Sequence, residues 1–355
     1  FLKDLRHSLS SSRALQSTLQ RASMSDTNLV RRSLGRFIAG IIAAVIAAAT
    51  IGASSALPAS AADSSQATLT FLDKSFTNNE IVLYGTPEYG VTLEAMLARK
   101  AGGYRLTQQL GAVKRVLADR SVVSYNKTGY LFTKDGALRT GRAGLFLFTS
   151  VALGVPNRPL QLIVFNDLKA NIGKDGSVSL ANNNAVEYAW IVLGLHAFGQ
   201  DALAGRVLSY VEGKQNADGG FAGWTPASST DATGLMLQAQ AALRSYGGSK
   251  VVAARKLSIG KAVAYLRRTS NGTDHWMSDN GDGTSSDDVN GTAYAAMGLI
   301  AAGVDAKKYS AWLKSLVAAD GGLKSAWSGA AGDVFATAQG FAPMVGKSYL
   351  QLMKK

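Results

Sequence analysis

Residues 214–243 read KQNADGGFAGWTPASSTDATGLMLQAQAAL, and this stretch decides the fold. It begins with the end of an amphipathic helix and turns at Gly219-Gly220, because adjacent glycines tolerate the backbone angles of a tight turn. The aromatic pair Phe221 and Trp224 and a polar group that ends in Asp231 then precede a second, nearly all-apolar helix. The stretch therefore predicts a helix hairpin.

The parts of this hairpin recur along the chain. Asp218-Gly219-Gly220-Phe221 is matched by Asp320-Gly321-Gly322-Leu323, and another aspartate follows 13 positions after the first one in both copies, at Asp231 and Asp333. Residues 285–293 repeat the polar group and the start of the second helix. Weaker copies of the apolar helix span 87–103, 139–154 and 184–199. The chain is therefore predicted to contain about six helix hairpins.

Two kinds of helix alternate in this pattern. The helix over 235–243 is apolar on nearly all sides, which is typical of a helix buried around its whole circumference. The segments between such helices carry an apolar stripe on one side only, with spacings of three and four residues. The stripes are Leu203, Val207, Tyr210 and Val211; Ile259, Val263 and Leu266; and Tyr309, Leu313, Leu316 and Val317. Alternating inner and outer helices predict an all-α fold, either an open solenoid or a closed ring.

Residues 215–221, Gln-Asn-Ala-Asp-Gly-Gly-Phe, followed by Trp224, resemble the repeat shared by protein prenyltransferases, squalene and other terpenoid cyclases, and transcobalamin-like carriers. The resemblance covers about residues 68–355 and implies a single α/α toroid of six hairpins over 62–355. In organisation the chain is most similar to the secreted transcobalamin-like members. Such a repeat is specific for the fold and says little about function.

The N-terminal residues carry the pattern of an export signal. Arg31, Arg32 and Arg36 precede the apolar run 37–53, and Ala59-Ser60-Ala61 is a small-residue cleavage site. We interpret 24–61 as a signal peptide and 1–23 as an upstream extension. An uncleaved membrane anchor is the alternative, because the run approaches the roughly 20 residues that a span needs. Cleavage predicts a secreted or surface-associated protein without a stable membrane span.

Composition excludes several classes of function. The sequence has no cysteine, so it forms no disulfide, and its net charge is +13. Residues 63–355 account for +8 of this charge, and their basic residues are scattered rather than gathered in a run with aromatics. We therefore expect no nucleic-acid partner. Zinc of the prenyltransferase type needs a cysteine, and only His196 and His275 follow the signal, so no metal and no cofactor is expected.

If the ring closes, the N-termini of the inner helices meet at one rim, where their unpaired N–H groups favour an anionic or polar ligand. The candidate ligand-binding residues at this rim are Trp224, Asp231, His275, Trp276, Asp287, Asp288, Trp327, Asp333, Glu187 and Tyr188. A structural interpretation stands beside each of them, because aspartates at helix starts are usually caps and tryptophans between hairpins are usually packing groups. Asp287 and Asp288 are adjacent, and a single aspartate is enough to cap a helix.

The leading hypothesis is a monomeric, exported binding protein, without an enzymatic role, that captures a small cobalamin-like or apolar molecule at the rim or in the cavity. The alternative is an enzyme, either a carbohydrate hydrolase or lyase acting on an oligosaccharide or a terpenoid-cyclase-like protein, with Asp287, Asp288 or Asp231 as the catalytic acid or base. Cyclases carry an Asp-x-Asp-Asp set, and Ser285-Ser286-Asp287-Asp288 lacks its first aspartate. Two carboxylates about 5 to 9.5 Å apart over an open cleft would favour glycoside chemistry.

Overall fold

A computed structural model describes residues 61–124, 127, 129–156, 158–179, 181, 184–270 and 272–353. These residues belong to one compact unit, Ala59–Lys355. The predicted extension 1–23 and nearly all of the predicted signal peptide lie outside the described residues. Among the described residues, none of the helices combines the length and the apolar composition that a membrane span requires.

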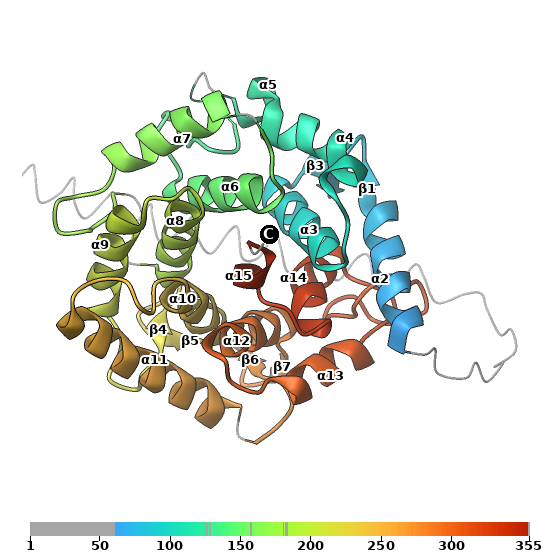
Figure 1. The fold of residues 1–355 in the computed structure, drawn as a ribbon. Helices are drawn as coiled ribbons and strands as arrows, with labels where there is room; N and C mark the ends of the chain where they lie inside the picture. The colour runs from blue at the N-terminus through green and yellow to red at the C-terminus, as the bar shows by residue number, and fades with distance from the viewer. Residues whose placement is uncertain are drawn as a thin grey trace, which may run out of the picture. The chain divides into compact units, whose positions relative to one another are not determined.

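Within the described residues, six helices form an inner ring (Figure 1). Each inner helix packs against the next one in the chain, and the last packs against the first, so the ring is closed. This confirms the predicted α/α toroid and decides between the solenoid and the ring. The inner helices are α3 (Tyr89–Ala101), α6 (Thr140–Ala152), α8 (Ala185–Ala197), α10 (Thr230–Ala242), α12 (Val289–Ala302) and α14 (Val334–Met344).

An outer layer surrounds this ring and alternates with it along the chain (Figure 1). The predicted one-sided stripes fall on outer helices, as in α9, where Leu203, Val207 and Val211 are buried. The outer elements are α2 (Ala61–Ser75), the short elements η1 (Leu106–Gln109), α4 (Leu110–Ala112), η2 (Val113–Ala118) and α5 (Arg120–Val123), then α7 (Arg158–Ala170), α9 (Asp201–Glu212), α11 (Ser249–Thr269) and α13 (Lys307–Ser315).

Glycine allows the closest contacts between inner helices. A Cβ at Gly234 of α10 would lie 2.4 Å from the Tyr294 carbonyl oxygen of α12, and a Cβ at Gly298 would lie 2.3 Å from the Gly234 carbonyl oxygen. Gly144 and Gly194 stand in the same relation between α6 and α8. Any larger side chain would push these backbones apart, so the glycines fix the diameter of the ring.

Short antiparallel strands precede several inner helices, and a threonine in the first turns of the helix anchors them. The Thr233 Oγ1 accepts a hydrogen bond from the Phe221 N–H at 2.9 Å, and the Thr337 Oγ1 accepts one from the Leu323 N–H at 2.9 Å. Thr92 and Thr292 hold Ile81 and Trp276 in the same way. The strands are β1 (Phe76–Thr77), β2 (Glu80–Leu83) and β3 (Thr86–Pro87), then β4 (Phe221–Ala222) with β5 (Ser228–Ser229), and β6 (Met277–Asp279) with β7 (Ser285–Asp287).

The short helix α15 (Tyr349–Leu352) lies inside the ring (Figure 1). Tyr349 is fully buried, and its ring packs against Phe148 of α6 and Trp190 of α8. Lys347 leads into α15 and donates a hydrogen bond of 2.7 Å to the Ala101 carbonyl at the end of α3. The segment therefore enters from the rim where the inner helices end and fills the ring axis on that side.

Candidate active site

A cavity of about 260 Å³ lies at the other rim, where the inner helices begin. First turns of α3, α6, α8 and α14 line it, together with the loop before α10. The ring axis is filled by α15 on the opposite side, so we describe the cavity as a cup with one mouth and call it the rim cavity. Its lining residues are Glu88, Gly90, Val91, Glu94, Tyr130, Gly141, Arg142, Leu145, Val186, Glu187, Trp190, Trp224 and Phe335.

Aromatic side chains form much of the wall of the rim cavity. Trp224 is 82% exposed and Phe335 is 42% exposed, so both present free ring surface at the mouth. Tyr130 and Trp190 are buried, and the Arg142 guanidinium lies 4.9 Å from the centre of the Tyr130 ring. Flat apolar faces beside carboxylates and a guanidinium suit a ligand with both C–H faces and polar groups.

Glu94 of α3 lines the rim cavity and is only 4% exposed. One carboxylate oxygen accepts from the Tyr294 hydroxyl and, at 3.3 Å, from the Tyr349 hydroxyl, and the other accepts from the Gln339 amide at 2.8 Å. Burial raises the pKa of Glu94, because the charged form loses its hydration, and the three donors only partly oppose this. Glu94 is therefore a carboxyl group held toward its protonated form.

Glu94 is not among the residues that the sequence pattern predicts for the site. The sequence does contain a sign of it: Glu94 is the one charged residue in the stretch Val91 to Ala98, and every residue of this stretch is buried in the structure. A charged side chain in such a position needs partners or a function.

Glu187 of α8, a predicted ligand-binding residue, also faces the rim cavity. Its side chain lies against the start of α6, where a Cβ at Gly141 would lie only 3.0 Å from it. Burial raises the pKa of Glu187, while the backbone of Gly141 and the charges of Arg142 and Arg139 lower it. Burial thus raises the pKa of both carboxyl groups, and the two differ in surroundings: arginines lie near Glu187, whereas hydroxyl and amide donors surround Glu94.

Asp231 and Asp288 begin neighbouring inner helices. The cap of α10 is Ser229, whereas Asp231 lies in the first turn and accepts from the Ala232 N–H at 2.8 Å. Asp288 caps α12 by accepting from the Gly291 N–H at 2.8 Å. Burial raises the pKa of Asp288, and the nearby negative charge of Asp231 raises it further. These two predicted residues thus interact, although neither lines the rim cavity.

The structure separates Asp287 from Asp288. Asp287 is exposed, and its carboxylate lies 3.2 Å from the His275 Nε2. His275 stacks on Trp312 of the outer helix α13, with ring centres 4.5 Å apart. Trp276 is 2% exposed, stacks on Tyr309 and donates from its indole N–H to the Thr269 hydroxyl at 3.0 Å. These predicted residues therefore lie toward the outer layer and away from the rim cavity.

The remaining predicted residues also lie elsewhere. Asp333 caps α14, accepting from the Ala336 N–H at 3.0 Å and from the Ser325 hydroxyl at 2.8 Å. Trp327 is 82% exposed in the loop before α14 but does not line the rim cavity. Tyr188 is buried and accepts from the Val178 N–H at 3.1 Å. Within the described residues, no three His, Cys, Asp or Glu side chains gather as metal ligands would.

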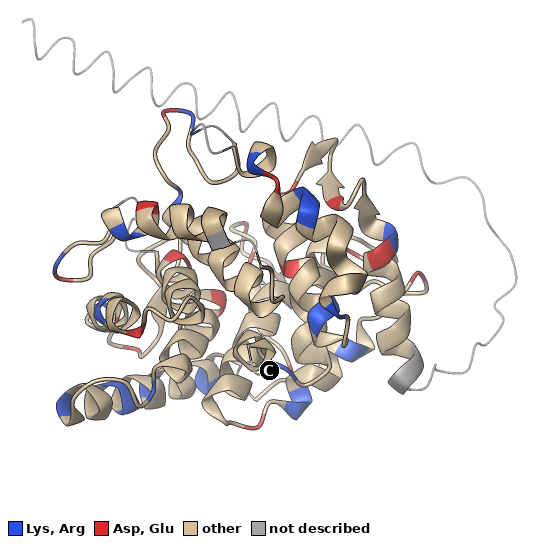
Figure 2. Cartoon of the chain, turned by 45° about the horizontal axis from the view of Figure 1, so that its top comes forward, with Lys and Arg blue, Asp and Glu red and all other residues tan. Residues whose placement is uncertain are grey.

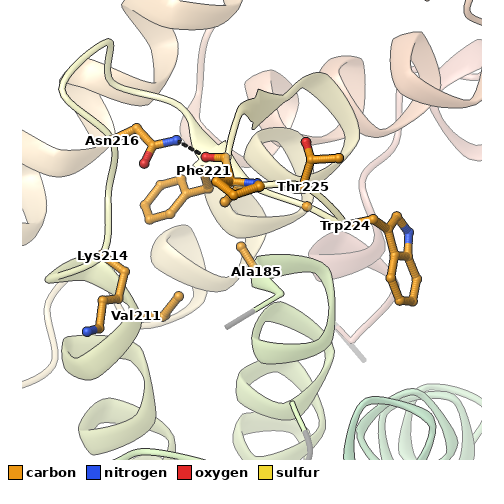
Figure 3. Close-up of a pocket in the computed structure, with 10 residues that line it drawn as sticks. Ala185, Val211, Lys214, Asn216, Phe221, Trp224 and Thr225 are labelled. Carbon is orange, nitrogen blue, oxygen red and sulfur yellow. Dashed lines mark hydrogen bonds between the residues drawn. The ribbon is translucent and has the colours of Figure 1, made fainter. Parts of the chain in front are cut away.

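A second hollow, of about 380 Å³, adjoins the rim cavity (Figure 3). The loop 221–226 covers it, and Ala185, Val211, Lys214 and Asn216 line its other sides. Trp224 lines both hollows, and in Figure 3 its indole points away from the other labelled side chains. This side chain therefore lies between the two spaces.

Comparisons with known proteins agree on the fold alone. No protein-family model and no curated protein sequence matches the chain. Among solved structures, the chain is similar to a type II terpene cyclase, MstE from Scytonema, with 15% identity, a TM-score of 0.58, and coverage of 80% of this chain and 97% of the cyclase.

Two carbohydrate-active proteins give similar values. An unsaturated glucuronyl hydrolase specific for heparin has 11% identity and a TM-score of 0.53, covering 80% of this chain and 95% of the hydrolase. A wild-type glycosidase has 14% identity and a TM-score of 0.51, covering 82% of this chain and 97% of the glycosidase. Identities this low support an α/α toroid and leave the chemistry to be argued from the site.

Proposed function

We propose that the chain is a carbohydrate-active enzyme of the hydrolase or lyase class that cleaves a sugar from the end of an oligosaccharide held in the rim cavity. The observation that carries this proposal is the placement of two carboxyl groups, Glu94 and Glu187, from different inner helices on one aromatic-walled cavity. Paired acids in unlike environments are the usual equipment for acid–base cleavage of a glycosidic bond.

The environments of the two acids suggest their roles. Glu94, fully enclosed and held toward its protonated form, is the proton donor to the glycosidic oxygen. The charges of Arg142 and Arg139 oppose the effect of burial and favour the carboxylate of Glu187, so we assign Glu187 as the base. In hydrolysis it takes a proton from the water that attacks the anomeric carbon, the glycosidic bond breaks, and the leaving sugar carries the proton given by Glu94.

The shape of the site supports attack at a chain end. The ring axis is occupied by α15, so a polymer cannot pass through the ring. The rim cavity, at about 260 Å³, is smaller than the roughly 300–1,000 Å³ of typical drug-sized pockets. It suits one sugar ring, with Trp224 and Phe335 offering faces on which further rings can stack.

A cyclase role has less support. Of the acids in Ser285-Ser286-Asp287-Asp288, Asp287 pairs with His275 on the outer side and Asp288 caps α12, so the two do not form a joint acid group. The small cavity is also poorly suited to a folded polyprenyl chain. A binding-only role is the second candidate, because Asp231 and Asp333 are satisfied by backbone N–H groups at helix starts.

The test is product analysis by mass spectrometry after incubating the full chain with a panel of neutral and uronate-containing oligosaccharides in ¹⁸O-labelled water. We expect release of a single terminal sugar. Uptake of ¹⁸O identifies a hydrolase, whereas an unsaturated, unlabelled product identifies a lyase. If an oligosaccharide of the panel raises the unfolding temperature of the protein but no member of the panel is cleaved, the proposal is contradicted and the binding-only role is supported.

A further inference from the structure

The outer helix α11 carries basic residues and no acidic ones. Its 21 residues include six that are basic, Lys250, Arg255, Lys256, Lys261, Arg267 and Arg268, and none that is acidic. Figure 2 shows this helix as a row of blue bands without red. This helix therefore carries five exposed cations, all but Arg255, with no acidic residue among them.

The inner side of α11 is fixed to the ring. Arg255 is fully buried and donates to Glu212 of α9 at 3.1 Å and to the Leu243 and Tyr246 carbonyls at 2.7 and 2.9 Å. Ser258 joins the same network through Gln240 and Gln215. Arg255 thus neutralises Glu212, and the helix presents a preformed outer face.

The outer face has an apolar line between two rows of cations. Ala253, Leu257, Gly260 and Ala264 follow one another at spacings of four, three and four residues, which places them along one line of the helix. The same helical geometry places Lys256 and Arg267 on one flank of this line. It places Lys250 and Lys261 on the other flank.

Two apolar side chains on this helix are open to solvent. Leu257 is 70% exposed and Val251 is 40% exposed. Both also line a groove of about 560 Å³ between α9 and α11, with Lys250 and Lys261 lining it beside them. Ser209, Glu212, Gln215 and Ser258 line the groove as well, and Glu212 pairs with Arg255, so Lys250 and Lys261 are the cations left to face an anionic group.

We propose that this α11 face, defined by Lys250, Lys256, Leu257, Lys261 and Arg267, docks on an anionic phospholipid surface. The cations face the lipid phosphates, and Leu257 enters the boundary between headgroups and acyl chains. A soluble anionic polymer would use the cations but would gain nothing from an exposed leucine, so the lipid surface accounts for more of the face. The inference is independent of the proposed enzymatic function.

The experiment is co-sedimentation of the full chain with vesicles of phosphatidylcholine alone and with added phosphatidylglycerol. Binding to the neutral vesicles is the baseline for each variant and is subtracted from its binding to the anionic vesicles. We expect the added binding to anionic vesicles to fall at least about tenfold in Lys256→Glu/Lys261→Glu. We expect a smaller, few-fold loss in Leu257→Gln.

Matched controls lie on other outer elements of the ring. Lys114→Glu/Lys134→Glu makes the same change in net charge at two exposed lysines, and Leu162→Gln removes a leucine that is 46% exposed on α7. Both controls should bind as the wild type does, and circular dichroism confirms that each variant is folded.

Three results would overturn the proposal. One is an equal loss in the charge control, which would mean that only net charge matters. Another is undiminished binding in Lys256→Glu/Lys261→Glu. The third is binding to a soluble polyphosphate as tight as binding to vesicles with no effect of Leu257→Gln, which would identify an anionic polymer as the occupant.

Discussion

The repeats that contain α10 and α14 are nearly the same framework with different surroundings. In both, an aspartate accepts from the second glycine of the turn, Asp218 from the Gly220 N–H at 3.0 Å and Asp320 from the Gly322 N–H at 3.1 Å. The bonds from Phe221 to Thr233 and from Leu323 to Thr337 have equal lengths. Both loops also carry a tryptophan that is 82% exposed.

The difference lies in what each repeat contributes to the cavity. Trp224 lines the rim cavity, and Trp327 in the matching loop does not. Glu94 and Glu187, which carry the proposed chemistry, have no counterpart in the repeated pattern. Most residues that recur therefore turn, anchor and cap helices, whereas the two acids of the site do not recur and the recurring tryptophan reaches the rim cavity in only one of these two repeats.

The largest expected effect tests the common framework. Thr233→Val and Thr337→Val keep the shape of the side chain but leave the buried N–H of Phe221 or Leu323 without an acceptor. Each should lower the free energy of unfolding by about 1–3 kcal/mol, measured by urea denaturation. Because the two repeats share this hydrogen bond, the two variants should lose similar amounts of unfolding free energy. A loss in one variant and none in the other would contradict the likeness of the repeats.

The tryptophan pair tests the difference. Trp224→Ala should weaken binding of the chain-end sugar by about tenfold, because it removes a stacking face of the rim cavity. Trp327→Ala deletes an equally exposed indole and should leave binding unchanged. Isothermal titration calorimetry with the released chain-end sugar gives both affinities. Equal losses of affinity in the two variants would show that the matching loops act alike.

The smallest effect concerns the caps. In the folded protein the pKa of Asp288 is raised above its ordinary value of about 3.9. Protonated Asp288 therefore contributes stability that is fully present below pH about 3.9, and this contribution is lost as the pH rises through the pKa of the folded state. Asp288→Asn keeps the cap without the charge and should be as stable as the wild type at acidic pH. At neutral pH it should be more stable by less than about 1 kcal/mol.

Asp333→Asn replaces the matching cap and controls for the substitution itself. Thermal unfolding as a function of pH gives the comparison for both variants. A neutral-pH gain of the same size in Asp333→Asn would mean that the cap, rather than the buried charge of Asp288, is responsible.

The sequence predicted the fold well because helix hairpins are local. Turn glycines, capping side chains and apolar periodicity all lie within a few residues of the element that they define, as at Gly219-Gly220 and Ser229. Even the weaker copies at 87–103, 139–154 and 184–199 became inner helices. Closure of the ring depended on contacts between α14 and α3, which no local pattern reports.

The site was predicted less completely, because it depends on which side of a helix faces the ring axis. Glu187 and Trp224 were chosen from their place near helix starts and do line the rim cavity. Asp287 and Asp288 are adjacent in sequence but point to different surroundings. Glu94 was missed because its partners, Tyr294, Gln339 and Tyr349, come from distant parts of the chain.

The central claim is that Glu94 and Glu187 act as acid and base in the rim cavity. The most direct test is the turnover number of Glu94→Gln and Glu187→Gln on the oligosaccharide that the wild type cleaves, with thermal unfolding measured beside it. The account predicts that each variant stays folded and loses about 100-fold or more in turnover number. Wild-type turnover in both folded variants would contradict it.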